Sequence, residues 1–456
     1  MGTDNNDRWW LLGAMGAILG VILLDETAVG VALPTIRKEL GLSEISAHWV
    51  VNIYLLTLAC LAGAAGRIGD IVGIRGLLTA GLFVFGAASV VAGFAQNGLA
   101  LLMARGVQGV GAAAIFPLSL TLIALSFDGA ERGKALGIYG AIGTCFLAAG
   151  PLVGGALTTG LSWRWIFWIN PIVVMCVGFV VWRLWRDPPS HIEERFDLAG
   201  LVLLVFGLSL SVYGIMQGPE VGWLHFNVFA ALIVGVLALV VFVFVETRHT
   251  DPLVAVALFR DPTFTASNLI VGTAQYSKIA TFVFGSMYLQ TVEGWGPLWA
   301  GMALLPAVIP TTLAAPIAGK LSDERGTRWP ALAGLVFITV GLSLVATGMM
   351  FKTMAIIFIG FVFFGAAVSL MFVPSQRAVT MSVPSHMQGQ AGGIVLSSQL
   401  IGGTLGMALC STILAVTASH AAVFWVAALI SLLVLTYSYF AIDIQEAGKQ
   451  TAPGND

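Results

Sequence analysis

Uninterrupted apolar stretches of about 20 residues recur along the whole chain, separated by short polar segments. A stretch of about this length crosses a hydrocarbon slab of about 30 Å as an α-helix. Strands of a transmembrane barrel would instead alternate apolar and polar residues over about ten positions, so the pattern predicts an all-α integral membrane protein. Fourteen transmembrane helices are expected, at residues 9–33, 47–66, 77–95, 99–125, 135–158, 165–185, 198–216, 226–246, 266–290, 298–319, 330–350, 355–376, 389–413 and 421–441.

Composition agrees with this pattern and excludes several classes of protein. Of the 456 residues, 58% are hydrophobic and 10% are charged, whereas a soluble protein carries about 25% charged residues. A net charge of −2 without a basic tract argues against nucleic-acid binding. The chain contains no phosphate-binding glycine-lysine loop, no H-E-x-x-H and no G-x-S-x-G. We therefore expect no enzyme activity, no cofactor and no metal site.

The distribution of positive charge predicts the orientation in the membrane. An even number of crossings places both termini on one side, and fifteen of the 21 Lys and Arg residues fall on that side, against four on the other and two within spans. Positive residues favour the cytoplasmic face, so both termini are expected in the cytoplasm. We expect the protein to lie in the plasma (inner) membrane. The first apolar stretch lacks a small-residue cleavage site, so we expect it to be retained.

An internal repeat predicts the domain organisation. Residues 66–75 (GRIGDIVGIR) are echoed by 319–328 (GKLSDERGTR), and two weaker echoes share nearly the same offset. The spacing predicts a duplicated six-helix unit with two helices inserted between the copies, a 6 + 2 + 6 arrangement. The expected parts are an N-terminal bundle, a linker with two inserted helices, a C-terminal bundle and a cytoplasmic tail, at 1–185, 186–262, 263–441 and 442–456. Parallel repeats of this kind are typical of transporters.

Ionisable residues at membrane depth are the candidates for function, because each costs at least about 2.5–3.5 kcal/mol to insert. The predicted helices contain Asp25 and Glu26 in the first, Arg105 in the fourth and Lys278 in the ninth, whereas every other acid falls in a predicted loop or tail. Burial disfavours an ionised carboxylate and a nearby cation favours it, so such an acid can alternate between protonated and ionised forms.

These four residues leave several interpretations open. Adjacent residues on a helix point about 100° apart, so we favour Asp25 as the proton-coupling residue, with Glu26 as its rival and buried structural pairs as the alternative. Arg105 either pairs with a first-helix acid or orients a coupling proton. Lys278 contacts substrate, balances an acid or reaches toward an interface, and we take it with Gln108 and Gln275 as candidates for a substrate cavity.

Two glycine-rich segments are candidates for moving parts. The first is a gating loop in which Asp70 and Arg75 form cross-helix ion pairs or lie at a helix terminus, repeated around Asp323 and Arg325; a solvated turn is the alternative. The second lies in the fifth helix, where a proline and three glycines predict a kink or close packing. Its residues are Gly150, Pro151, Gly154 and Gly155.

Four motifs in these segments resemble those of the major facilitator superfamily, specifically its fourteen-helix drug/proton antiporter branch. The loop motif G-x-L-[AG]-D-R-x-G-R-[RK] is met at Gly66, Gly69, Asp70, Gly73 and Arg75, with Ile71 and Ile74 at two positions where the family has cations. R-x-x-Q-G-x-G is complete from Arg105, and G-P-x-x-G-G runs from Gly150 to Gly155. The first-helix pattern L-D-x-T-x-V-N-V-A-L-P is met from Leu24, with Gly30 in place of asparagine.

The resemblance implies an alternating-access bundle with Asp25 and Arg105 in proton coupling and export favoured by Gly150-Pro151. It implies a monomeric exporter of amphipathic small molecules, drugs or lipids that exchanges them for protons and uses the proton gradient as its energy source. The absence of acids in later helices, with Lys278 there instead, favours neutral, zwitterionic or acidic amphiphiles. A proton-coupled importer of a metabolite and a non-transporting membrane receptor remain as alternatives.

Overall fold

The structure is a computed structural model that describes residues 5–127, 129–187, 197–249, 252–383 and 387–442. Within these ranges all regular structure is helical. Apart from Ile442, the expected cytoplasmic tail lies outside the described residues, as do positions 188–196 and 250–251 of the expected linker. The helices are α1 (Asn5–Leu40), α2 (Glu44–Val72), α3 (Ile74–Gly93), α4 (Gly98–Ser126), α5 (Gly129–Gly160), α6 (Trp165–Leu184), α7 (Leu198–Val221), α8 (Phe226–Glu246), η1 (Val256–Arg260), α9 (Pro262–Ile279), η2 (Ala280–Gly285), α10 (Ser286–Thr291), α11 (Pro297–Ala303), α12 (Leu305–Arg325), α13 (Arg328–Met350), α14 (Met354–Met381), α15 (Gln388–Thr417) and α16 (His420–Ala441).

Fourteen helical passes confirm the predicted fold class. Thirteen segments of the described chain are long and apolar enough to cross a membrane, among them one that combines α11 and α12. The remaining pass, expected at 266–290, is assembled from α9, the π-helical turn η2 and α10. A π-helical turn interrupts the regular hydrogen-bond ladder, and such turns are frequent at functional sites.

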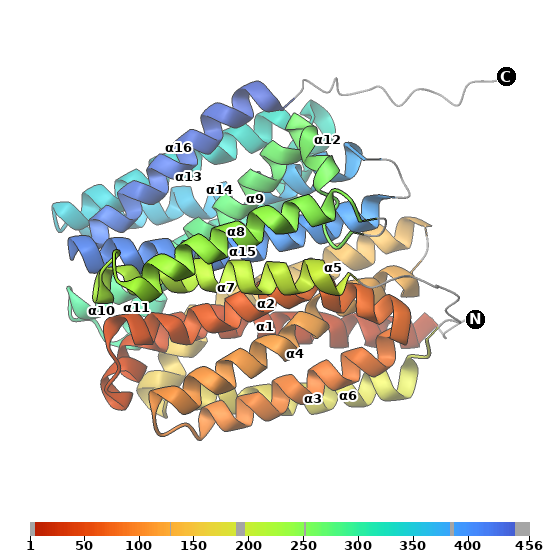
Figure 1. The fold of residues 1–456 in the computed structure, drawn as a ribbon, viewed down its shortest axis with the longest axis horizontal. Coiled ribbons are helices and arrows are strands. Elements are labelled where there is room, and N and C mark those ends of the chain that lie inside the picture. The colour runs from red at the N-terminus through yellow and green to blue at the C-terminus, as the bar shows by residue number, and fades with distance from the viewer. Residues whose placement is uncertain (1–4, 128, 188–196, 250–251, 384–386, 443–456) are drawn as a thin grey trace. The chain divides into compact units, whose positions relative to one another are not determined.

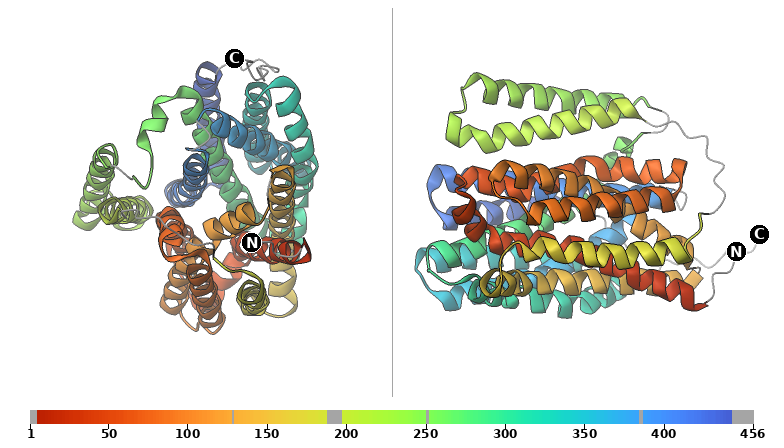
Figure 2. Two further views of the ribbon diagram at one scale, coloured as in Figure 1. Left: turned by 90° about the vertical axis from the view of Figure 1, so that its right-hand side faces the viewer. Right: turned by 90° about the horizontal axis from the view of Figure 1, so that it is seen from below.

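The chain divides into two compact units. The first contains the described parts of 1–256, 278–305 and 403–420, and the second those of 257–277, 306–402 and 421–456. In Figure 1 the first six helices, coloured red to yellow, run roughly along one direction within the first unit. The right-hand view of Figure 2 shows α7 and α8 as an antiparallel hairpin. The duplication and its 6 + 2 + 6 boundaries stay a prediction.

Local sequence explains where several helices of the first unit begin and end. Ser43 and Asn97 precede α2 and α4, and their side chains accept hydrogen bonds from the backbone N–H groups of Ser46 and Ala100. Such caps satisfy donors that have no partner inside the helix. Gly73 separates α2 from α3 with φ +98°, a conformation that favours glycine. Most of the predicted gating loop is therefore the last turns of α2, and only Gly73 breaks the helix.

Glycines in α5 let this helix lie against α1 and α11. A Cβ at Gly154 would lie 2.7 Å from Ala28 Cα, and one at Gly155 would lie 2.5 Å from the Pro297 carbonyl oxygen. Gly150 faces Thr27 at similarly short range. Helix α5 continues through Pro151 to Gly160. The structure thus assigns these glycines to close packing, and their use as a gating kink stays a prediction.

We expect Gly154→Ala to destabilise the protein by about 1–3 kcal/mol, because the added methyl group overlaps the α1 backbone. Gly140→Ala is the matched control on the same helix, since a Cβ there meets nothing within 4 Å. The control should be neutral or stabilising by up to about 1 kcal/mol. Thermal unfolding of the purified variants measures both effects, and equal midpoints would contradict the close packing of α5 on α1.

Candidate functional site

Asp25 of α1 and Arg105 of α4 form an ion pair in the interior of the first unit. The Arg105 Nη1 atom donates to Asp25 Oδ2 at 2.5 Å, and both side chains are fully buried. The sequence left open whether Arg105 meets a first-helix acid, and the structure brings it to Asp25. Because hydrocarbon offers no water to either charge, each residue supplies the compensation that the other needs.

Gln108 links the two members of this pair. It lies one turn beyond Arg105 on α4, and its Oε1 accepts from Arg105 Nη1 at 2.7 Å. Its Nε2 donates to Asp25 Oδ1 at 3.3 Å and to Ser89 Oγ at 3.0 Å. Asn170 also donates to Ser89 Oγ, at 3.2 Å. Ser89 and Asn170 are not predicted from the sequence, because their only signal there is their polarity within apolar helices.

Helix α2 fixes the guanidinium of Arg105 from another direction. Arg105 Nε donates to the carbonyl of Val50 at 3.0 Å, and its carbon Cζ lies 4.2 Å from the centre of the Tyr54 ring. The Phe167 ring of α6 lies 5.6 Å away. Aromatic faces attract a cation that has lost its water. Arg105 therefore keeps favourable contacts that do not depend on Asp25.

Glu26 and Lys278 form a second, separate ion pair. Lys278 Nζ lies 3.5 Å from Glu26 Oε1, and both side chains are 7% exposed. Lys278 is the penultimate residue of α9, two positions before η2 begins. Gly30, one turn beyond Glu26, permits the close approach, because a Cβ there would lie 3.0 Å from Val283 Cγ2 in η2. The two adjacent acids of α1 thus have different cationic partners.

The other candidates for a substrate cavity do not all meet in one place. Gln108 belongs to the Asp25 network. Gln275 accepts a hydrogen bond from Gln399 Nε2 at 3.4 Å, within the second unit. Of the three candidates for a substrate cavity, Lys278 is the one that lies beside Glu26.

The gating-loop residues lie around the junction of α2 and α3. Asp70 is exposed in the last turn of α2, and Gly69 packs against Leu118. The backbone N–H of Arg75 donates to Asp187 Oδ1 at 2.9 Å, and its guanidinium donates to the Trp182 carbonyl at 2.5 Å. Arg75 is therefore tied to the end of α6 and the residues after it.

The repeat copy of this segment contains an ion pair of its own in the second unit. Asp323, near the end of α12, pairs with Arg377 of α14. Arg325 is exposed at the end of the same helix. Asp323 therefore makes a cross-helix ion pair and also lies near a helix terminus, and a gating role for this segment stays a prediction.

Two further acids are buried where the chain enters α7 and where it leaves α8. Asp197 and Glu246, at the start of α7 and the end of α8, are 3% and 2% exposed. Asp197 accepts from the Gly200 backbone N–H at 2.8 Å, and Glu246 accepts from that of Val254 at 3.0 Å. The sequence placed both residues at the borders of linkers, where burial depends on how the two inserted helices close on each other.

Comparison with known proteins identifies the family of this chain. The model of the Major Facilitator Superfamily matches residues 15–310 and 279–455. The chain belongs to the Major Facilitator Superfamily. It is therefore a multi-pass membrane transporter and not an enzyme.

Several relatives in this superfamily are resistance or export proteins. The puromycin resistance protein pur8 of Streptomyces alboniger is 34% identical over 89% of this chain and 82% of its own length. The multidrug resistance protein Stp of Mycobacterium tuberculosis is 30% identical over 90% of this chain and 76% of its own length. The cephamycin export protein CmcT of Amycolatopsis lactamdurans is 32% identical over 86% of this chain and 82% of its own length. Among solved structures, a bacterial homolog of the human lysosomal transporter Spinster, in an inward-facing and occupied conformation, has the same fold, with a TM-score of 0.69 at 15% identity over 96% and 97% of the two chains.

Direct contacts join helices of this transporter's first unit toward the end that carries the turn between α1 and α2. Gln290 of α10 donates to the Val31 carbonyl of α1 at 2.8 Å, and the Leu298 N–H of α11 donates to Thr159 of α5 at 3.3 Å. At the same end, His48 of α2 shares a hydrogen bond of 2.6 Å with Ser411 of α15. In the predicted orientation this end faces away from the cytoplasm. Superfamily transporters expose their sites to the two sides in turn.

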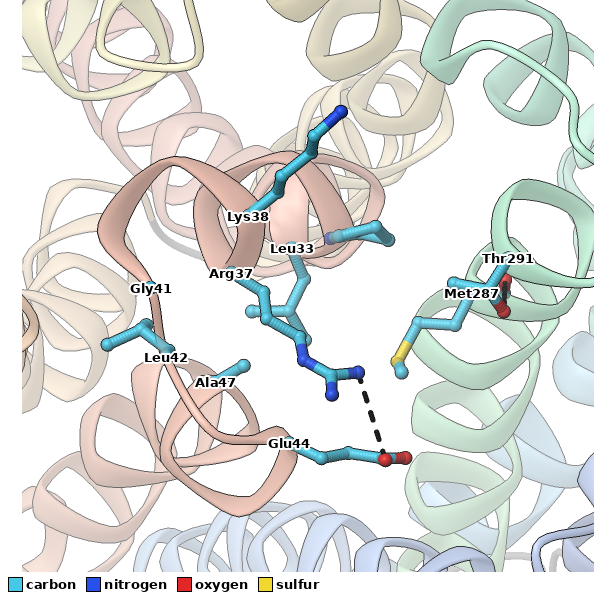
Figure 3. Close-up of a pocket in the computed structure, with 10 residues that line it drawn as sticks. Leu33, Arg37, Lys38, Gly41, Leu42, Glu44, Ala47, Met287 and Thr291 are labelled. Carbon is cyan, nitrogen blue, oxygen red and sulfur yellow. Dashed lines mark hydrogen bonds and ion pairs between the residues drawn. The ribbon is translucent and has the colours of Figure 1, made fainter.

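A cavity of about 480 Å³ opens at this same end. Figure 3 shows the Arg37 side chain reaching from α1 toward Glu44 at the start of α2, with Met287 of α10 facing them. The Arg37 Nη1 and Glu44 Oε2 atoms are 3.8 Å apart, and both side chains are exposed. Because exposed ion pairs contribute little to stability, this one is open to exchange with other charges.

We expect Arg105→Met to destabilise the protein by about 3–5 kcal/mol, because Asp25 then stays buried without its cation. The double variant Asp25→Asn/Arg105→Met removes both charges and should recover most of the loss. Arg164→Met is the control, since its pair with Glu39 is partly exposed and should be worth at most about 1 kcal/mol. Thermal unfolding of the single and double variants gives the coupling energy, and effects that add within about 0.5 kcal/mol would show that the two residues do not interact.

Proposed function

We propose that this transporter exports amphipathic small molecules, drug-like compounds or lipids, in exchange for protons. The observation that carries the proposal is the fully buried Asp25–Arg105 pair, with Gln108 bonded to both members. A proton bound to Asp25 removes the charge that attracts Arg105. Arg105 keeps its contacts with Val50 and Tyr54 when this happens, so protonation changes the network without leaving the guanidinium isolated.

The state of this pair fits one step of an exchange cycle. Arg105 donates to Asp25, and the contacts of Gln290 and His48 are made in the same unit. In an exporter, the proton leaves Asp25 on the cytoplasmic side and the substrate binds there. The outer end then opens, the substrate leaves and a new proton binds Asp25. Coupling follows because Asp25 releases its proton on one side and regains it on the other.

Relatives support the direction and the class of substrate. Proteins that are 28–34% identical to this chain are named for resistance to or export of puromycin, tetracenomycin C, cephamycin and multiple drugs. We propose the same direction here, with the proton gradient as the energy source and no cofactor. We further propose that the transporter acts as a monomer in the plasma membrane with both termini in the cytoplasm.

Proteoliposomes with an imposed pH gradient test the coupling. We expect a fluorescent zwitterionic phospholipid to accumulate on the acidic side, and Asp25→Asn to reduce this transport to the level of protein-free vesicles. Whatever transport Glu26→Gln retains should still depend on the gradient, because the Glu26–Lys278 pair is separate from the Asp25 network. Asp7→Asn, on the same helix, is the control.

Gradient-driven transport that persists in Asp25→Asn would refute the role of this residue. Accumulation on the alkaline side would instead indicate an importer, and binding without transport would indicate a receptor. Each of these results contradicts the proposed exchange.

The orientation of the termini has its own test. An epitope tag at either end should be digested by protease in inverted membrane vesicles and protected in intact spheroplasts, because the positive residues lie mostly on that side. A tag between α1 and α2, at Gly41, should show the reverse pattern. Protection of both terminal tags in inverted vesicles would overturn the orientation.

A further inference from the structure

Helix α1 carries two adjacent ion pairs that differ in how tightly the protein encloses them. Asp25 and Arg105 are fully buried, 2.5 Å apart, and both are bonded to Gln108. Glu26 and Lys278 are 3.5 Å apart, and each side chain keeps 7% of its surface exposed. In the Glu26–Lys278 pair the charged atoms are farther apart, and both side chains keep some exposed surface. This pair can therefore exchange partners at a lower cost in free energy than Asp25–Arg105.

The surroundings of Lys278 supply more polar groups than the fold uses. Ser277 and Thr281 lie within one helical turn of Lys278 and are fully buried. Among the described residues, neither hydroxyl has a hydrogen-bond partner. Buried hydroxyls are normally hydrogen-bonded. Unpartnered hydroxyls in the helical turn that carries Lys278 and leads into the π-helical turn η2 point to a polar ligand at this turn.

The buried pair limits which charges that ligand can carry. A cation that binds Glu26 displaces Lys278 and leaves its ammonium group buried without an anion. An anion that binds Lys278 takes this cation away from Glu26. Uncompensated buried charges are strongly unfavourable. A ligand that carries one charge of each sign compensates both side chains at once.

We propose that the Glu26–Lys278 pair is the polar anchor for a zwitterionic amphiphile, whose cationic group binds Glu26 and whose anionic group binds Lys278. This inference rests on the proposed function, since it names the substrate class of the same transporter. It also separates the two tasks of α1: Asp25 carries the proton, and Glu26 on a different face of the helix holds the substrate. Both side chains stay compensated in the empty and in the loaded protein.

A matched series of three fluorescent probes tests the charge requirement. Nε-dansyl-lysine is zwitterionic, dansylcadaverine has only the cationic group, and 6-(dansylamino)hexanoate has only the anionic group. The three share the fluorophore and a linear spacer of similar length. Binding to the purified transporter in nanodiscs is measured by fluorescence without any pH gradient. The wild-type protein should bind the zwitterion about tenfold or more tightly than either of the other probes.

Variants of the pair should change this preference in predictable directions. Glu26→Gln should favour the anionic probe and Lys278→Met the cationic one. Glu26→Gln/Lys278→Met, which leaves no unpaired charge and so keeps folding separate from binding, should lose the advantage of the zwitterion. Lys352→Met removes the same charge from an exposed turn and should bind as the wild type does.

A wild-type preference for either singly charged probe, equal affinities or no binding of the zwitterion would overturn the inference, as would a zwitterion preference that persists in the double variant. The outcome is independent of transport. If the zwitterion preference holds and Asp25→Asn still transports along the gradient, the proposed proton coupling fails while the anchor stands. If Asp25→Asn abolishes transport and the probes bind equally, the anchor fails while proton coupling stands.

Discussion

A charge buried among membrane helices must find its compensation inside the protein, because hydrocarbon offers neither water nor counter-ions. The arrangement of the first unit follows from this requirement. Asp25 and Glu26 both lie on α1, and each is matched by one cation from another helix, Arg105 from α4 and Lys278 from α9. Any process that changes the charge of one member, whether protonation or ligand binding, must therefore rearrange its partner.

Close packing gives these pairs their geometry. The glycines of α5 and Gly30 of α1 remove the side chains that would hold neighbouring helices apart. Helix α1 consequently lies tightly between α5 and η2, and small shifts of these helices change the distances between charges. Because packed interfaces have few alternative arrangements, such shifts occur as discrete steps rather than gradually. The glycine motifs and the ion pairs thus belong to one mechanical arrangement.

Helix α2 connects the Asp25–Arg105 network to Ser411 of α15. Its residues Val50 and Tyr54 contact Arg105, while His48 on another face is bonded to Ser411. Val50 and His48 are two residues apart on the same helix. Under the proposed proton coupling, α2 is a physical route by which the protonation state of Asp25 biases the contact with Ser411.

The sequence alone determined the fold class, because apolar stretches of membrane-spanning length leave helices as the only structure that satisfies the backbone. It also identified Asp25, Glu26, Arg105 and Lys278, since ionisable residues inside such stretches are rare and costly. Which acid pairs with which cation depended on the rotation of α1 and the approach of η2, and no spacing in the chain encodes either. Ser89, Asn170 and His48 were missed for the same reason, as was the burial of Asp197 and Glu246. Helix-to-helix contacts decide these features, because they bring together residues far apart in sequence and set the distances on which electrostatic compensation depends.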